Sequence, residues 1–169
     1  EERAALRPDP RWTAYLTNLH VTDEEPVRRP GKLPPGPHPD GFERWRASNV
    51  IPQGQAGYVM AVLTLPLGDL TSDQGRALAE IARRFSGDAI RTTADQNMML
   101  RWVSEADRPA LYTALRGAAL ASAGAGTITD ITACPGTDTC KLGISSSRAL
   151  AAELGRQLVD TGLGDDPQA

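Results

Sequence analysis

The sequence is poor in the side chains that most often carry catalysis or bind metals. Its 169 residues include two cysteines, two histidines and only 5% aromatic residues. The histidines, His20 and His38, lie far from the cysteines along the chain, so a zinc site lacks an evident set of four ligands. No Ser/His/Asp set, phosphate-binding loop or paired-carboxylate motif is present. The usual signatures of hydrolases and phosphate-binding proteins are therefore missing.

Lysines and long apolar runs are also scarce. The net charge is −3, which gives no reason to expect binding to nucleic acid or to an anionic membrane. No signal peptide or transmembrane run is visible, and two cysteines without an export signal favour a cytoplasmic protein. Lys32 and Lys141 are the only lysines, so most cations are arginines, whose planar guanidinium groups suit carboxylate partners.

The local signals predict an extended beginning followed by a compact unit. Residues 1–41 hold most of the prolines and are expected to form an extended linker, with a short helix or strand at Arg11–Val21. The run Tyr58–Leu65 is dense in β-formers and apolar on both faces, as in a buried strand. Ile90–Val103 predicts a second strand region, interrupted by the polar residues 95–97.

One amphipathic helix is predicted after each of these two strand regions. A capping box at residues 71–74 starts the first helix, and Gly87 is expected to end it. The second helix is predicted to start at residues 107–109 and to end at Gly124 and Gly126. Residues 127–132 are predicted to form a third strand. The order β-α-β-α-β predicts a split βαβ, ferredoxin-like unit, an α+β fold with helices on one face of an antiparallel sheet.

The two cysteines stand together in a loop. Cys134 and Cys140 are separated by five residues within the Pro/Gly/Thr-rich stretch Thr132–Gly143. An Ala/Leu-rich helical pattern follows at Ile144–Val159, which places Cys140 near a predicted helix N-terminus, where a thiolate is favoured. The alternatives to metal binding are two unremarkable thiols or a small disulfide loop, and the latter is not expected without signs of secretion. A [4Fe–4S] cluster normally takes four cysteines, so this pair accounts for part of such a site.

This loop resembles the first cysteine pair of the siroheme-dependent nitrite and sulfite reductases, in which Cys-x5-Cys is followed later by Cys-x3-Cys. Upstream, Ile90–Leu100 is similar to a strand segment of that family's second ferredoxin-like half-domain. The resemblance runs from about Phe42 to Leu154. It implies a linker, a half-domain and the beginning of the siroheme- and [4Fe–4S]-binding domain, at residues 1–41, 42–126 and 127–169.

The resemblance implies an oxidoreductase that reduces nitrite to ammonia or sulfite to sulfide by six-electron transfer. A ferredoxin-type donor would supply electrons through a [4Fe–4S] cluster to siroheme, where the small inorganic anion binds. No Cys-x3-Cys follows Cys140 within these 169 residues. The chain is therefore interpreted as an internal fragment, expected to be inactive by itself and to hold neither cofactor, and none of its residues is named as catalytic.

Two groups of residues are candidates for the cofactor region. The resemblance makes Cys134 and Cys140 cluster ligands, with the cation of Lys141 beside them; Lys141 would otherwise point into solvent.

Arg91 and Thr93 are two apart on a predicted strand and so share a face, where they are suited to a siroheme carboxylate. Gln96 and Asn97 follow where the strand pattern breaks. The simpler alternatives are a solvent-facing strand for the first pair and a local turn for the second.

Other functions and assemblies stay open. The cobalamin-pathway monooxygenase shares these repeats, and a stand-alone ferredoxin-like module that mediates assembly without a cofactor is the alternative from another class. In the family the half-domain packs edge to edge with a second half, so the sheet edge of this chain is expected to recruit a second copy in a homodimer. The proline-rich beginning could cover that edge instead.

Overall fold

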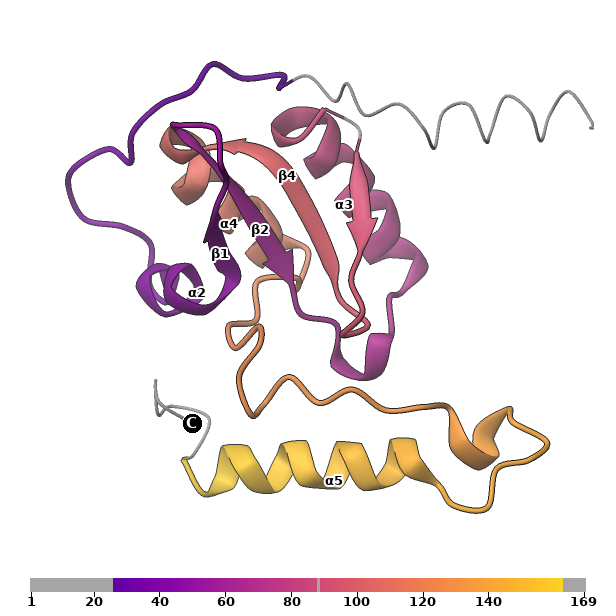
Figure 1. Cartoon of the computed structure of the whole chain (residues 1–169). Helices are drawn as coiled ribbons and strands as arrows, with labels where there is room; N and C mark the ends of the chain where they lie inside the picture. The colour runs from indigo at the N-terminus through magenta and orange to yellow at the C-terminus, as the bar shows by residue number, and fades with distance from the viewer. Residues whose placement is uncertain (1–25, 88, 163–169) are drawn as a thin grey trace, which may run out of the picture.

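The computed structural model describes residues 26–87 and 89–162. Four strands form one antiparallel sheet in the order β1-β2-β4-β3, and helices α3 and α4 pack beside each other behind it in the view of Figure 1. Helix α5 lies below the sheet in the same view and contacts the chain after β2 through Arg148, which bonds Leu67 O. The strands are β1 (Val50–Pro52), β2 (Tyr58–Leu63), β3 (Ile90–Thr92) and β4 (Met98–Ser104), and the helices are α2 (Phe42–Asn49), α3 (Ser72–Phe85), α4 (Arg108–Gly117) and α5 (Ser147–Asp160).

The strand order confirms the predicted split βαβ unit. Strands β2 and β3 are joined through α3, and both pair antiparallel with β4, which lies between them. They therefore run parallel to each other with one strand inserted, as in a ferredoxin-like half-domain. The sheet and its helices make this an α+β fold.

The predicted third strand at residues 127–132 is wrong. This segment is a bend and turn at residues 127–129 followed by loop, and β1 forms the edge of the sheet beside β2. The short turn after Pro52 joins β1 to β2, and the two strands pair from Val50↔Ala61 to Pro52↔Val59. Threonine hydroxyls then satisfy the local backbone instead of a sheet: Thr127 Oγ1 donates to Gly124 O at 2.8 Å.

Strand β2 and helix α3 are built as their sequences predict. Five of the six residues of β2 are buried, and Val59, Ala61 and Leu63 belong to the hydrophobic core. Helix α3 begins with the capping box of Thr71 and Gln74. Its apolar stripe enters the core, and Gly87 adopts φ 71 directly after the C-cap Ser86. The buried residues of the stripe are Leu78, Ile81, Ala82 and Phe85.

Helix α4 is shorter than predicted, since it ends at Gly117 and not at residues 124–126. Ala119 takes a left-handed φ of 54, which stops the helix, and Leu120 N then donates to Leu115 O at 2.8 Å. Leu120 is nevertheless buried, as its apolar side chain predicted, although it faces inward from the turn after the helix.

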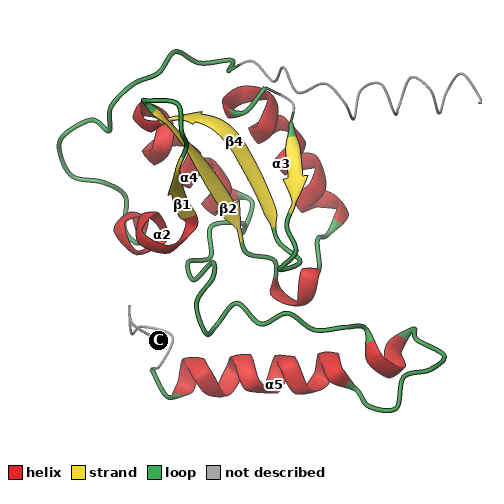
Figure 2. Cartoon of the chain, viewed as in Figure 1, coloured by secondary structure: helices red, strands yellow, loops and turns green. Residues whose placement is uncertain are grey.

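Long stretches before α2 and after α4 lack regular secondary structure. Residues 26–41, the described part of the proline-rich beginning, contain neither helix nor strand, while the predicted element at Arg11–Val21 lies outside the described residues. Figure 2 shows the chain between α4 and α5 as loop, apart from the short 3-10 helix η4 (Gly136–Asp138). None of the helices within residues 26–87 and 89–162 is both long and apolar enough to cross a membrane.

Candidate functional site

The cysteine loop, Ala133–Ser147, folds tightly onto itself. Thr137 N donates to Ser145 O at 3.1 Å, and Cys140 N donates to Gly136 O at 3.0 Å. Gly136 and Gly143 touch where the two arms of the loop cross, because a Cβ on Gly143 would lie 2.6 Å from the carbonyl carbon of Gly136. Only residues without a side chain fit at this crossing, so the sequence of the loop fixes its shape.

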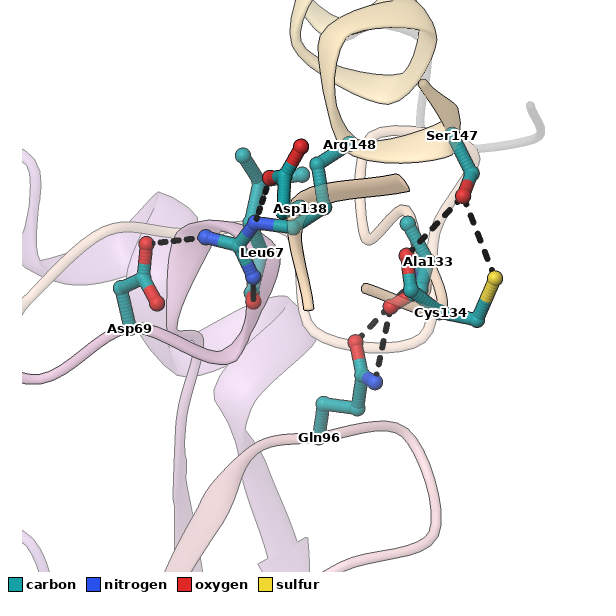
Figure 3. A network of polar contacts seen from close by, with 8 residues as sticks. All are labelled: Leu67, Asp69, Gln96, Ala133, Cys134, Asp138, Ser147 and Arg148. Carbon is teal, nitrogen blue, oxygen red and sulfur yellow. Dashed lines mark hydrogen bonds and ion pairs between the residues drawn. The ribbon is translucent and has the colours of Figure 1, made fainter. Parts of the chain in front are cut away.

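Both cysteines of the loop are exposed free thiols. Cys134, and not Cys140, lies beside the N-terminus of α5: its Sγ is 3.1 Å from Oγ of Ser147, the first residue of that helix (Figure 3). The prediction that Cys140 occupies this position is wrong, because the helix begins at Ser147 and not near Ile144. The turn that follows Cys140 holds Lys141 and precedes the helix.

The surroundings of Cys134 favour its ionised form. The hydrogen bond with the Ser147 hydroxyl, and next the backbone N–H of Gly136, lower the pKa of the Cys134 thiol below its ordinary value. A thiolate is the form of cysteine that ligates metals. One of the two thiols is therefore prepared for ligation by the loop itself.

Gln96 attaches the cysteine loop to the half-domain. Its side-chain Nε2 donates to Ala133 O at 3.0 Å, and its Oε1 accepts from Ala133 N at 3.2 Å. The residue lies in the five-residue loop (residues 93–97) of the β3–β4 hairpin with a left-handed φ of 62. Gln96 thus stands in a turn, as its position in the broken strand pattern suggested, and its side chain bonds the backbone of the residue before Cys134.

Asn97 is a buried link between three segments. Its Oδ1 accepts from Leu65 N at 2.8 Å, and its Nδ2 donates to both carboxylate oxygens of Asp130, at 2.9 and 2.8 Å. The side chain is 2% exposed. Thr93 closes the same hairpin, since its Oγ1 accepts from Asn97 N at 3.2 Å. These two polar groups are engaged in holding the end of the sheet together.

Arg148 is the residue of this site that the sequence reasoning missed. Its guanidinium donates to Leu67 O at 2.9 Å, forms an ion pair with Asp69, and lies 3.4 Å from Asp138 of η4 (Figure 3). A signal for it exists in the sequence: a cation in the first turn of a helix opposes the helix dipole. Such a residue is stabilised there only by acceptors from elsewhere in the molecule.

The structure brings some of the predicted residues together and leaves others apart. Thr93, Gln96, Asn97 and Arg148 line one cavity of about 360 Å³ beside the hairpin turn. Arg91 is exposed on β3, paired opposite Met99, and Lys141 is exposed in the cysteine loop; neither lines this cavity.

The donors that the described residues offer to a metal are two thiols close together in one loop. No three His, Cys, Asp or Glu side chains within residues 26–87 and 89–162 gather closely enough to hold a metal ion. The thiols of Cys134 and Cys140 are available, and their softness matches iron–sulfur chemistry. The residues present thus fit two of the four ligands that a [4Fe–4S] cluster takes.

The comparisons with known proteins agree with this architecture. Residues 51–118, from β1 to the turn after α4, match the family model of the nitrite/sulfite reductase ferredoxin-like half domain. The chain is 31% identical over 150 residues to the assimilatory ferredoxin-dependent nitrite reductase of Haloferax mediterranei. That alignment takes in 78% of this chain and 26% of the relative, so the chain spans about a quarter of the relative's length. With the match and the split βαβ sheet together, the chain belongs to the nitrite/sulfite reductase family, of which it carries a ferredoxin-like half-domain.

Proposed function

We propose that this chain is the part of a siroheme-dependent reductase that supplies Cys134 and Cys140 as two ligands of a [4Fe–4S] cluster. The observation that supports this most directly is the position of the cysteine loop. Two exposed thiols lie in a loop bonded to the hairpin turn of a half-domain that matches the reductase family. A module that served assembly alone has no need of a tightly built loop with two accessible thiols.

The remaining two cysteine ligands and siroheme itself belong to the proposal for the whole protein. When bound, the two cofactors carry electrons to a small inorganic anion. Arg91 and Lys141, both exposed cations, are the candidates for siroheme carboxylates and cluster charge. Thr93, Gln96 and Asn97 remain candidates too, and because their polar groups already bond within the chain, their contribution would be to shape the cavity wall.

The proposed reaction is the six-electron reduction of nitrite to ammonia with a ferredoxin-type donor. The name of the Haloferax relative favours nitrite over sulfite. We propose a cytoplasmic enzyme, and we expect this chain alone to be inactive and colourless, because two thiols do not complete a cluster.

The coding sequence beyond Ala169 tests the proposal. We expect a Cys-x3-Cys pair some tens of codons downstream, which would supply the other two ligands. If the open reading frame continues without that pair, the cluster lacks its ligands and the reductase proposal fails. The cofactor-free assembly module would then be the better explanation of the half-domain.

A further inference from the structure

Two side chains from different elements bind the cysteine loop, one at its start and one in its middle. Gln96, in the β3–β4 turn, pairs with Ala133, the residue before Cys134. Arg148, in the first turn of α5, pairs with Asp138 in the middle of the loop. Figure 3 shows the two sets of contacts side by side, with the backbone of the loop between them.

The Gln96 side chain binds Ala133 as the backbone of a neighbouring strand would, with one hydrogen bond donated and one accepted. A side-chain amide offers one donor and one acceptor, and here it meets the acceptor and the donor of a single residue, Ala133. The two bonds fix both the position and the direction of the chain as it enters Cys134. The amide is itself fixed, because Gln96 stands in a tight turn and its Cβ packs on Gly68.

The Arg148 contacts join the loop to the turn after β2. One guanidinium serves Leu67 O and Asp69 on the half-domain and Asp138 in the loop. Its side chain is 24% exposed, whereas the Asp69 side chain is 70% exposed, so the cation is the better shielded partner. A guanidinium can serve several acceptors at once because its donors spread in a planar fork.

We propose that Gln96 and Arg148 are positioning residues that hold the cysteine loop, and with it the Cys134 thiol, in one place on the half-domain before any metal binds. The benefit of this positioning for metal binding rests on the proposed function, whereas the contacts that hold the loop do not depend on it. A loop that is already ordered loses less conformational entropy when its thiols ligate a cluster. Neither residue needs to touch the cluster to have this effect.

Amide hydrogen exchange of the 169-residue chain, resolved by NMR, tests the proposal without any cofactor. The variants are Gln96→Met, which keeps the side-chain length but loses both bonds, and Arg148→Ala. We expect exchange at Thr137 and Cys140, whose amides close the loop, to speed up by roughly tenfold or more, since each variant removes hydrogen bonds that hold the loop. The Cys134 Cβ resonance should move toward its random-coil position, while amides of β2 and β4 keep their protection.

Conservative variants separate a positioning role from a general loss of stability. Gln96→Glu keeps the acceptor for Ala133 N, so the Ala133 amide should stay more protected than in Gln96→Met. Arg148→Lys keeps the charge without the fork and should restore part of the loop protection. The matched control is Arg156→Ala, because Arg156 lies on the same helix and its ion pairs among the described residues are with Glu153 and Asp160 of that helix.

Exchange at Thr137 and Cys140 that matches the Arg156→Ala control in both Gln96→Met and Arg148→Ala would overturn the proposal. If Gln96→Met or Arg148→Ala unfolds the sheet, exchange at the Thr137 and Cys140 amides is measured instead in Gln96→Glu and Arg148→Lys, and the same comparison with the control applies. The cluster proposal fails separately, through retention of a cluster after loss of Cys134, so the two failures cannot be confused.

Discussion

The buried amide of Asn97 contacts one donor and one carboxylate, and both contacts depend on its having an N–H and a C=O. Leu65 N needs an acceptor, and the Asp130 carboxylate needs a donor, in a place where water has little access. Asp130 also accepts from Gly126 N at 2.8 Å, so the amide holds the turn that replaces the predicted third strand. Few other side chains satisfy both neighbours.

Asn97→Asp should therefore destabilise the fold strongly at neutral pH. The new carboxylate still accepts from Leu65 N but faces Asp130, and two adjacent carboxylates repel each other. Repulsion raises the folded-state pKa of the pair above its unfolded value, so the lost stability returns as pH falls through that raised pKa. We expect a loss of about 2 to 4 kcal/mol in urea unfolding at pH 7, shrinking toward pH 4. A pH-independent difference from wild type would contradict this explanation.

The hydrogen bond from Ser147 is the largest cause of the lowered pKa of the Cys134 thiol. Ser147→Ala removes this cause, so the pKa of the Cys134 thiol should rise. At any pH near the pKa, a smaller fraction of Cys134 should then be thiolate than in wild type. The pH profile of Cys134 alkylation by iodoacetamide, followed by peptide mass spectrometry, should move to higher pH. Cys140 in the same sample controls for the reagent, because Ser147 hydrogen-bonds to Cys134 and to no atom of Cys140. An unmoved Cys134 profile would show that Ser147 does not stabilise the thiolate.

At the scale of elements, the success of sequence reasoning followed the strength of local signals. Helix α3 has a capping box, an apolar stripe and a glycine after its end, and strand β2 has a dense β-forming run. Both were predicted because their signals are carried by neighbouring residues. Residues 127–132 look like a strand locally, yet the sheet position is taken by β1, which only three residues form. That competition is a property of the whole sheet and is not visible in either segment.

The site divides in the same way. The break in the strand pattern at residues 95–97 identified the turn that holds Gln96 and Asn97, and the Pro/Gly/Thr-rich composition around the cysteines identified the loop. Which atoms these amides bond could not be predicted, because their partners, Ala133 and Asp130, lie more than thirty residues away. The later start of α5 has a similar cause. Ser145 O accepts the hydrogen bond from Thr137 N that closes the cysteine loop, so the chain up to Ser145 belongs to the loop and the helix begins at Ser147.

The close contact between Gly136 and Gly143 determines how the two arms of the cysteine loop pack. Gly143→Ala places a Cβ within 2.6 Å of the Gly136 backbone, so the two arms must separate and the hydrogen bond from Thr137 N to Ser145 O should be lost. We expect faster amide exchange at Thr137 with an unchanged sheet. Gly117→Ala is the matched control, because a Cβ there meets nothing within 4 Å. A Gly143→Ala chain whose Thr137 amide exchanges like wild type would contradict the steric argument.

At the scale of the whole molecule, both edges of the sheet are short. Strands β1 and β3 have three residues each, and no described strand pairs with the outer side of either. Pro52 in β1 removes a donor from one edge, so β3 is the edge more suited to pair with another copy. We predict that light scattering of the 169-residue chain finds a dimer in a wide concentration range. A strictly monomeric chain would rule out this pairing.

The central claim concerns Cys134 and Cys140, and the most direct measurement is electron paramagnetic resonance of the reduced polypeptide that contains this segment together with the downstream cysteine pair. Cys134→Ser and Cys140→Ser should each abolish the [4Fe–4S] signal and the bound iron that belongs to it, with protein yield and half-domain fold retained. Thr139→Ser, which changes a residue between the two cysteines without touching a thiol, should keep the signal. A full cluster signal in either cysteine variant would contradict the assignment of that thiol as a ligand.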